Sequence, residues 1–410
     1  MDLFRKFYKR AVWMQLHNYM ASQSLNYAGH CIKPQNHRYR KSIGKSCLRK
    51  ITRPLQLKQT EEKDKFYLLL LSFNLWKRFF DFNISIKYNV AMGKSPPKET
   101  IVITGGVGFI GANLIRNLLE KDYEIHLLWK KSSDPWRILD IKDQINFHII
   151  DIVNQTKLKS VLTKINPSVI FHLATYSSYR NQEDVNQIFD VAIKGTLSLL
   201  HATKEIPYKI FVNIGSSSEY GFKEKPMKES DLLEPISFYA AAKSGQTLLC
   251  QTFSYQYKKP IVTIRPFSVY GPYEQKDRFI STIIRSLING ETIRLTGGKQ
   301  RRDFIYVDDL IDLYTKIIKN SNKLSGKILN AGTGFEYSND EVVQTLFKVM
   351  GQKTKIEKGK FPKRMWDAPH WVADITATKK LLGWFPKYSL EKGLKANYDW
   401  FLKNKSLYES

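Results

Sequence analysis

Tyr239 and Lys243 are the residues of this chain that most clearly could do acid–base chemistry. They lie four residues apart in Tyr239-Ala-Ala-Ala-Lys243, at the start of a helical pattern, and residues at i and i+4 face the same side of a helix. A free tyrosine, with a pKa of about 10, is a poor acid or base at neutral pH. A neighbouring ammonium favours the phenolate and lowers that pKa. Most Tyr/Lys pairs with this spacing lie on a protein surface and have no catalytic role. A catalytic role for this pair therefore depends on the residues around it.

Ser216 supplies that context. It follows an apolar stretch, 209–214, that predicts a strand. A hydroxyl at the carboxyl end of a strand lies at the edge where doubly wound sheets bind ligands. There Ser216 would hold a substrate oxygen and help to stabilise developing charge. We therefore predict Ser216, Tyr239 and Lys243 as a catalytic group.

The stretch 101–111, IVITGGVGFIG, predicts a buried strand, a glycine turn and the start of a helix. Gly105 suits a tight turn, Gly108 lets the backbone approach a pyrophosphate, and Gly111 lets the helix pack close to the strand. The helix N-terminus, at Phe109 and Ile110, offers free N–H groups to phosphate. A plain strand-turn-helix also uses glycines, but here strand, spacing and helix coincide. We predict a dinucleotide site.

The end of the second predicted strand bears on the choice of dinucleotide. A carboxylate that holds the ribose 2′-hydroxyl of NAD is expected there, but the sequence has Lys130, Lys131 and Ser132. These would receive a 2′-phosphate, and Arg137 is close enough in sequence to join them. NADP(H) is therefore preferred and NAD(H) remains possible. The alternative is a solvated basic loop.

The third predicted strand ends at Asp151. Its carboxylate could accept the adenine amino group, or it could cap the following helix. The residues predicted to contact the cofactor are Gly105, Gly108, Phe109, Ile110, Gly111, Lys130, Lys131, Ser132, Asp151, Ile152, Leu173, Ala174, Thr175, Tyr239 and Lys243.

Composition narrows the class of protein. The 410 residues carry a net charge of +27, of which residues 1–98 hold +15. That basic extension has three open interpretations: a basic surface arm, an amphipathic membrane-surface helix over 66–82, or a poorly ordered extension. We do not favour membrane contact, and we expect no nucleic-acid role. The three cysteines have neither disulfide-framework nor metal-ligand spacing, which predicts no metal site and fits the cytoplasm.

From residue 100 onward, strands and helices alternate. This predicts a Rossmann-type, doubly wound parallel α/β sheet with a smaller C-terminal α/β lobe. The expected domains are 1–98 (extension), 99–265 (dinucleotide-binding and catalytic) and 266–405 (substrate lobe). The predicted strands are 101–104, 124–129, 145–150, 168–173, 209–214 and 261–264, and the predicted helices are 109–121, 155–165, 184–204, 238–257, 279–289 and 340–349.

With these elements in place, residues 100–402 resemble the extended short-chain dehydrogenase/reductase family, in its nucleotide-sugar branch. The resemblance rests on a set of motifs that are jointly specific for the family. They are TGGVGFIG at 104–111, FHLAT at 171–175, SSSEYG at 216–221, YAAAK at 239–243, RPFSVYGP at 265–272, RRDFIYVDDL at 301–310 and LGWFPKYSLEKGL at 382–394.

The resemblance implies a role for each matching residue. Tyr239 would be the general acid and base, with Lys243 as the partner that lowers its pKa, and residues 172–175 would line the cofactor ribose. A nucleotide-diphosphate sugar would be the substrate, and a homodimer is expected through 184–204 and 238–257. The family's Asn in N-V-x-G-T is absent, since Ala192 stands there. The implied substrate-binding residues are Ser217, Ser218, Arg302 and Arg364, with a structural ion pair as the alternative for each arginine.

Three reactions of this branch remain to be separated. The basic loop at Lys130 favours NADPH-dependent reduction of a 4-keto-6-deoxy nucleotide sugar, as in synthases of CDP-abequose type. The alternative is an NAD-dependent 4-epimerase similar to UDP-glucose 4-epimerases. A 4,6-dehydratase is disfavoured because Glu219 stands one place beyond the family's acidic position, and a non-catalytic NAD(P)-binding scaffold is disfavoured by the intact Ser216, Tyr239 and Lys243.

Overall fold

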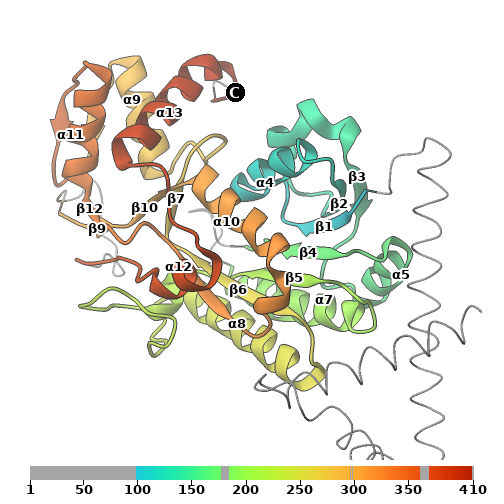
Figure 1. Ribbon diagram of the computed structural model, residues 1–410. Coiled ribbons are helices and arrows are strands. Elements are labelled where there is room, and N and C mark those ends of the chain that lie inside the picture. Colours follow the sequence, from blue (N-terminus) through green and yellow to red (C-terminus); the bar gives the residue numbers. More distant parts are fainter. Residues whose placement is uncertain (1–97, 177–183, 296, 298, 361–368, 409–410) are drawn as a thin grey trace, which may run out of the picture. The chain divides into compact units, whose positions relative to one another are not determined.

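A computed structural model of the chain describes residues 98–176, 184–295, 297, 299–360 and 369–408. All of them belong to one compact unit, Pro97–Ser410. The basic extension lies outside the described residues, apart from its last residue. In the described part of the chain, no helix is both long and apolar enough to cross a membrane. Element labels follow Figure 1.

A parallel sheet of seven strands carries the site, in the order β11-β6-β5-β4-β1-β2-β3. The central strands are fully buried and, apart from His172 and Asn213, apolar, as expected for a parallel sheet covered on both faces. The predicted doubly wound α/β fold is confirmed. The strands are β1 (Thr100–Thr104), β2 (Glu124–Trp129), β3 (Asn146–Ile149), β4 (Val169–His172), β5 (Ile210–Ile214), β6 (Ile261–Pro266) and β11 (Ile328–Ala331).

Helices cover both faces of the sheet (Figure 1). On one face, α4 and α10 pack into a core with β1, β4 and β5. On the opposite face, α5, α7 and α8 form a second core with the other side of the same strands. Their bounds are α4 (Phe109–Leu119), α5 (Gln155–Ile165), α6 (Val185–Phe189), α7 (Thr196–Thr203), α8 (Phe238–Tyr257) and α10 (Val307–Lys319).

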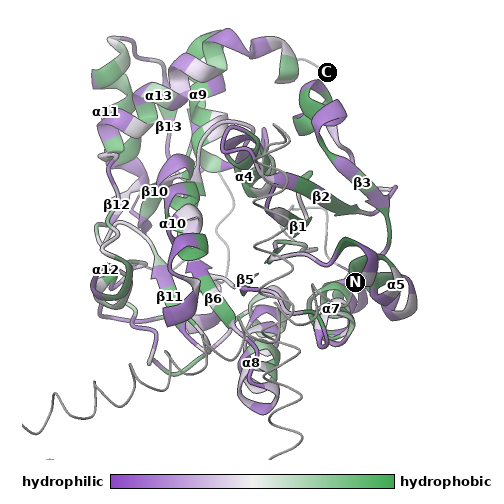
Figure 2. Cartoon of the chain, turned by 45° about the vertical axis from the view of Figure 1, so that its right-hand side comes forward, coloured by the Kyte–Doolittle hydropathy of each residue, from purple (hydrophilic) through white to green (hydrophobic). Residues whose placement is uncertain are grey.

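The C-terminal part adds a smaller lobe with a core of its own. Its helices are amphipathic, and Figure 2 shows both hydrophilic and hydrophobic colour around α11 and α13. The lobe contains α9 (Phe279–Asn289), α11 (Asn339–Met350), α13 (Leu390–Lys403), and the short strands β7 (Ser268–Tyr270), β8 (Ile293–Arg294), β9 (Arg301–Arg302), β10 (Phe304–Tyr306), β12 (Tyr337–Ser338) and β13 (Ile356–Glu357). Nearby, α12 (Thr376–Leu382) contacts β11.

The helix predicted over 184–204 is interrupted. A π-helical turn, Asp190–Gly195, separates α6 from α7. Ala192, which replaces the family's asparagine, is buried against Ile188 and Ala242. A Cβ on Gly195 would lie 2.6 Å from the Ile152 side chain, so this turn packs closely on the loop after β3. The seventh strand, β11, was not predicted.

Candidate active site

The carboxyl ends of β1, β4 and β5 open into a cleft of about 2480 Å³. Strands that run parallel in adjacent positions end at the same edge, and this edge is the usual ligand site of such sheets. The glycine turn, the end of β2 and the first turn of α8 line the cofactor side of the cleft. The lobe residues around α9 and Arg302 line the other side.

The glycine turn fits a dinucleotide pyrophosphate. Gly105 has a φ of +72°, and a Cβ there would lie 2.6 Å from the Ala174 backbone nitrogen. A Cβ on Gly111 would lie 2.5 Å from the Gly105 carbonyl oxygen, so both positions need glycine. Gly108 begins α4 without a side-chain cap. The first N–H groups of that helix are therefore available to phosphate oxygens.

Most of the predicted cofactor residues reach the wall of this cleft. His172, which the resemblance placed near the cofactor ribose, is instead buried and hydrogen-bonded to Thr104 and Thr196, and burial lowers its pKa to about 3. Lys131 is exposed outside the cleft wall. The predicted residues that line the cleft are Gly105, Gly108, Phe109, Ile110, Gly111, Lys130, Ser132, Asp151, Ile152, Leu173, Ala174, Thr175 and Tyr239.

The basic loop after β2 forms an ion pair with the end of the neighbouring strand β3. The Lys130 Nζ lies 3.1 Å from the Asp151 Oδ2. Asp151 is not the helix cap, since Asn154 caps α5 by accepting from the Lys157 N–H. Arg137 does not join the loop. It is buried and donates to the carbonyl oxygens of Tyr273 and Val107, so it links the glycine turn to the segment after β7.

Ser216 is held at the carboxyl end of β5 by its own turn. Its Oγ accepts from the Ser218 N–H at 3.1 Å and lies 2.7 Å from the Ser218 Oγ. Its N–H donates to the Glu219 Oε1 at 2.7 Å. The result is a capping box on the 3₁₀ turn Ser217–Tyr220. Ser216 and Ser218 line the cleft.

Lys243 lies one turn along α8 from Tyr239, beneath the cleft. Its Nζ donates to the Ile214 carbonyl oxygen at 2.8 Å and to the Gln246 Oε1 at 3.0 Å. The Gln246 Nε2 donates to the Asn213 Oδ1 at 2.6 Å, and the Asn213 Nδ2 donates to the Thr263 Oγ1 at 3.1 Å. All the side chains of this relay are buried. The ammonium is thus held by a polar chain that crosses β5 and β6.

Burial sets the electrostatics of this pair. Desolvation lowers the pKa of Lys243 to about 8, and the charge of Glu219 partly opposes that shift. Burial raises the pKa of Tyr239, while hydrogen bonding to Ser216 and the charge of Arg278 lower it. Arg278, which lines the lobe side of the cleft, therefore favours the ionised form of the Tyr239 phenol. Only the sequence separation of Tyr239 and Lys243 was visible beforehand, so the cation at 278 was missed.

Glu219 does not face the cleft. Its Oε2 lies 2.9 Å from the Arg265 Nε, and both side chains are almost fully buried. The Arg265 guanidinium stacks 4.5 Å from the centre of the Tyr220 ring. Arg265 therefore has a structural role. The carboxylate closest to Ser216 in the sequence serves to hold the catalytic turn.

Of the remaining predicted substrate-binding residues, Ser217 and Arg302 lie in the described part of the chain, and of these only Arg302 is found in the cleft lining. The Ser217 Oγ accepts from the Trp371 Nε1 at 2.9 Å and lies outside the cleft lining. Arg302 lines the cleft, with its guanidinium 5.5 Å from the centre of the Trp371 ring. Arg364 lies outside the described residues. No signal in the sequence connected Trp371 to the serine turn.

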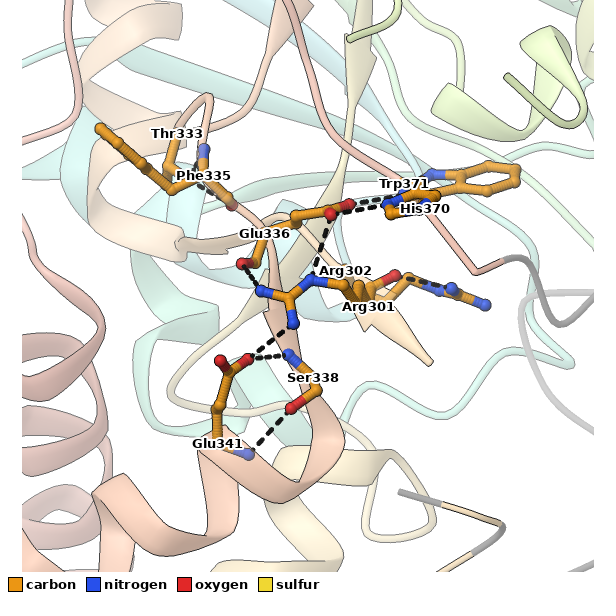
Figure 3. Close-up of polar contacts among 9 residues, drawn as sticks. All are labelled: Arg301, Arg302, Thr333, Phe335, Glu336, Ser338, Glu341, His370 and Trp371. Carbon is orange, nitrogen blue, oxygen red and sulfur yellow. Dashed lines mark hydrogen bonds and ion pairs between the residues drawn. The ribbon is translucent and has the colours of Figure 1, made fainter. Parts of the chain in front are cut away.

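Arg301, the neighbour of Arg302, forms ion pairs with two glutamates. Arg301 lies 3.0 Å from Glu336 and 3.2 Å from Glu341 (Figure 3). Asp303 accepts hydrogen bonds from Thr333, Gly334 and Ala373. Asp309 accepts from the N–H groups of residues 387 and 388. These carboxylates therefore fasten the lobe.

Comparison with known proteins identifies the family of this chain. The model of the NAD dependent epimerase/dehydratase family matches residues 101–332. The chain belongs to this family. UDP-glucuronate 4-epimerase of Thermodesulfobacterium geofontis is 32% identical over 321 residues, which cover 75% of this chain and 98% of that protein.

Solved structures give the same fold. UDP-glucuronic acid 4-epimerase from Bacillus cereus, in complex with UDP-glucuronic acid and NAD, is 28% identical with a TM-score of 0.67, covering 74% of this chain and 99% of that one. dTDP-glucose 4,6-dehydratase from Bacillus anthracis, in complex with NAD, is 25% identical with a TM-score of 0.68, covering 75% and 98%. The family thus joins epimerases and dehydratases in one architecture.

Proposed function

We propose that this protein is an NAD-dependent nucleotide-sugar 4-epimerase. The observation that carries the proposal is the pairing of Ser216 with Tyr239 at the cleft, together with the removal of Glu219 into a buried ion pair. The first feature serves oxidation and reduction at a sugar carbon. The second leaves the catalytic turn without the carboxylate that elimination of water would use.

The side chains have separate tasks in this reaction. Tyr239 removes the proton of the C4 hydroxyl and later returns it, and Ser216 holds the same oxygen throughout. Lys243 supplies the positive charge that favours the phenolate. Bound NAD would supply the hydride acceptor and donor that oxidation and reduction at C4 require. Because the ketone is reduced again in the same site, no cofactor is consumed.

NAD is proposed in place of the NADP(H) favoured by the basic loop. Lys130 lies against Asp151, which offsets its charge, and Lys131 is outside the cleft wall. The solved relatives described above were determined with NAD. The same comparisons support the epimerase over the ketoreductase, because a 4-epimerase stands among the similar sequences and among the similar structures.

A UDP-hexuronic acid is the proposed substrate class. Arg278 lines the cleft, and its charge lowers the pKa of Tyr239, the proposed acid and base. A sugar carboxylate would be attracted there, whereas a neutral hexose would gain nothing from the charge. Arg302 would receive the diphosphate, since guanidinium groups match phosphate oxygens. UDP-glucuronic acid is the natural first compound to test.

A cytoplasmic homodimer completes the proposal. The helices expected to form its interface, α7 and α8, expose Leu197, Leu248 and Tyr255, the last at 81%. Apolar side chains gathered on adjacent helices favour association. The catalytic test is conversion of UDP-glucuronic acid to its C4 epimer by protein that receives no added cofactor.

A further inference from the structure

Trp371 contacts both the catalytic turn and the lobe. Its indole N–H donates to the Ser217 Oγ at 2.9 Å, and Ser217 is the chain neighbour of Ser216. The Arg302 guanidinium lies 5.5 Å from the centre of its ring, within the range of a cation–π contact. The side chain is only 8% exposed, among Tyr220, Met227 and Phe267. Trp371 therefore contacts both the neighbour of Ser216, which is proposed to hold the sugar, and Arg302, which is proposed to bind the diphosphate.

The backbone of Trp371 is fixed separately. Its N–H donates to the Glu336 Oε2 at 3.1 Å, and the Glu336 Oε1 lies 3.0 Å from the Arg301 Nε and 2.8 Å from the His370 Nδ1. Figure 3 shows Glu336 between Arg301 and the His370–Trp371 segment. The carboxylate is 18% exposed, so these contacts are only partly screened by water. The indole is held from its backbone as well as from its ring.

We infer that Trp371 is a positioning residue that couples diphosphate binding at Arg302 to the placement of Ser216. This inference rests on the proposed function and adds a residue to it. The ring face orients the Arg302 guanidinium toward the cleft. The ring edge fixes Ser217, and through the backbone it fixes the hydroxyl of Ser216.

The two contacts differ in what their loss should do. Without the N–H, the Ser217 hydroxyl loses a buried partner and the catalytic turn relaxes, while Arg302 keeps an aromatic face. Without the ring, Arg302 also loses its cation–π contact. The first loss should lower kcat alone, and the second should also weaken nucleotide binding. If Trp371 only filled space, both substitutions would lower stability, and they would not differ in their effects on kcat and nucleotide binding.

The test uses full-length protein and three variants, compared per mole of bound cofactor. Ser217→Ala and Trp371→Phe should each lower kcat about fivefold with an unchanged UDP dissociation constant. The double variant should lose no more than either single one, because both remove the same hydrogen bond. Trp371→Leu should in addition raise the UDP dissociation constant and the substrate KM about fivefold.

Trp384→Phe is the matched control. Trp384 is another buried tryptophan whose indole N–H donates to an oxygen, the Asp309 carbonyl, away from the cleft. This variant should lower the unfolding midpoint and leave kcat and UDP binding unchanged. Multiplied losses in the Ser217/Trp371 double variant, or normal UDP binding by Trp371→Leu, would overturn the inference. If the wild-type protein binds UDP but converts no UDP-sugar, the proposed function fails, while the UDP measurements still decide the Arg302 contact.

Discussion

Glu219 and Arg265 form an ion pair directly behind the catalytic serine turn, with 2.9 Å between Oε2 and Nε. The arginine comes from β6, and the glutamate also accepts the Ser216 N–H. β6 thereby holds the backbone of Ser216, the residue proposed to hold the substrate oxygen. Stability and catalysis are linked at this pair.

Glu219→Gln should therefore affect both properties. Removing one charge leaves the Arg265 guanidinium buried and uncompensated, which typically costs about 3–5 kcal/mol of unfolding free energy. Denaturant unfolding would measure this loss. Glu391→Gln is the control, because its pair with Lys348 is exposed and should be worth less than about 1 kcal/mol. Equal losses for the two variants would contradict the structural role of the buried pair.

Tyr239→Phe should reduce kcat by about 10²- to 10⁴-fold, because the phenol is the proposed acid and base. Bound NAD, released by denaturation and quantified, should remain near the wild-type amount. Tyr257→Phe on the same helix is the control, since that residue lies outside the cleft lining, and its kcat should not change. A Tyr239→Phe enzyme with appreciable turnover would refute the assignment.

The pH profile of kcat should report Lys243. Its pKa is lowered to about 8 by burial, so the ammonium is lost, and activity falls, as the pH rises through about 8. Of the groups around it, Glu219 on the serine turn and Cys250 on the same helix favour the charged form, while burial keeps His172 on β4 neutral.

Substitutions of Gln246 should shift the pH at which kcat falls on the alkaline limb of the profile. Gln246→Leu removes an acceptor from the ammonium and should shift the limb down by about one pH unit. Gln246→Glu keeps an acceptor and adds a negative charge, so the limb should shift upward. Shifts of the same sign in both variants would show that the relay does not act on the lysine.

Arg278→Gln should change substrate preference. The kcat/KM for UDP-glucuronic acid should fall at least tenfold, roughly the worth of one charge-assisted hydrogen bond, while that for UDP-glucose should change little. Competition between the two substrates in one reaction measures the ratio directly. Equal losses of kcat/KM for the two substrates would contradict the prediction. They would show that Arg278 acts on a part that both substrates share, or only on Tyr239.

The sequence predicts the parts of this site that are local. The glycine turn and the Tyr239–Lys243 pair need only a strand, a turn and a helix, and their backbone geometry follows from short-range rules. Six strands of the sheet were predicted for the same reason. The seventh, Ile328–Ala331, is as short as β3 and β4, but it lies within residues 266–405, which were assigned to the substrate lobe and not to the sheet.

The missed features depend on distant partners. Arg137 binds a carbonyl 136 positions away, so its proximity to the basic loop in sequence was misleading. Trp371 reaches Ser217 across 154 positions. In the run Ser216-Ser-Ser218, the sequence cannot tell which hydroxyl faces the cleft. That choice is set by the capping geometry of Ser216 and by the indole of Trp371.

The most direct test of the account follows a deuterium label at C4 of UDP-glucuronic acid, incubated with purified protein and no added cofactor. A 4-epimerase predicts the C4 epimer with the deuterium still at C4 and no net change in bound NAD. Product that forms only with added NADPH, or that has lost water and carries the label at another carbon, would contradict the account and indicate a reductase or a dehydratase.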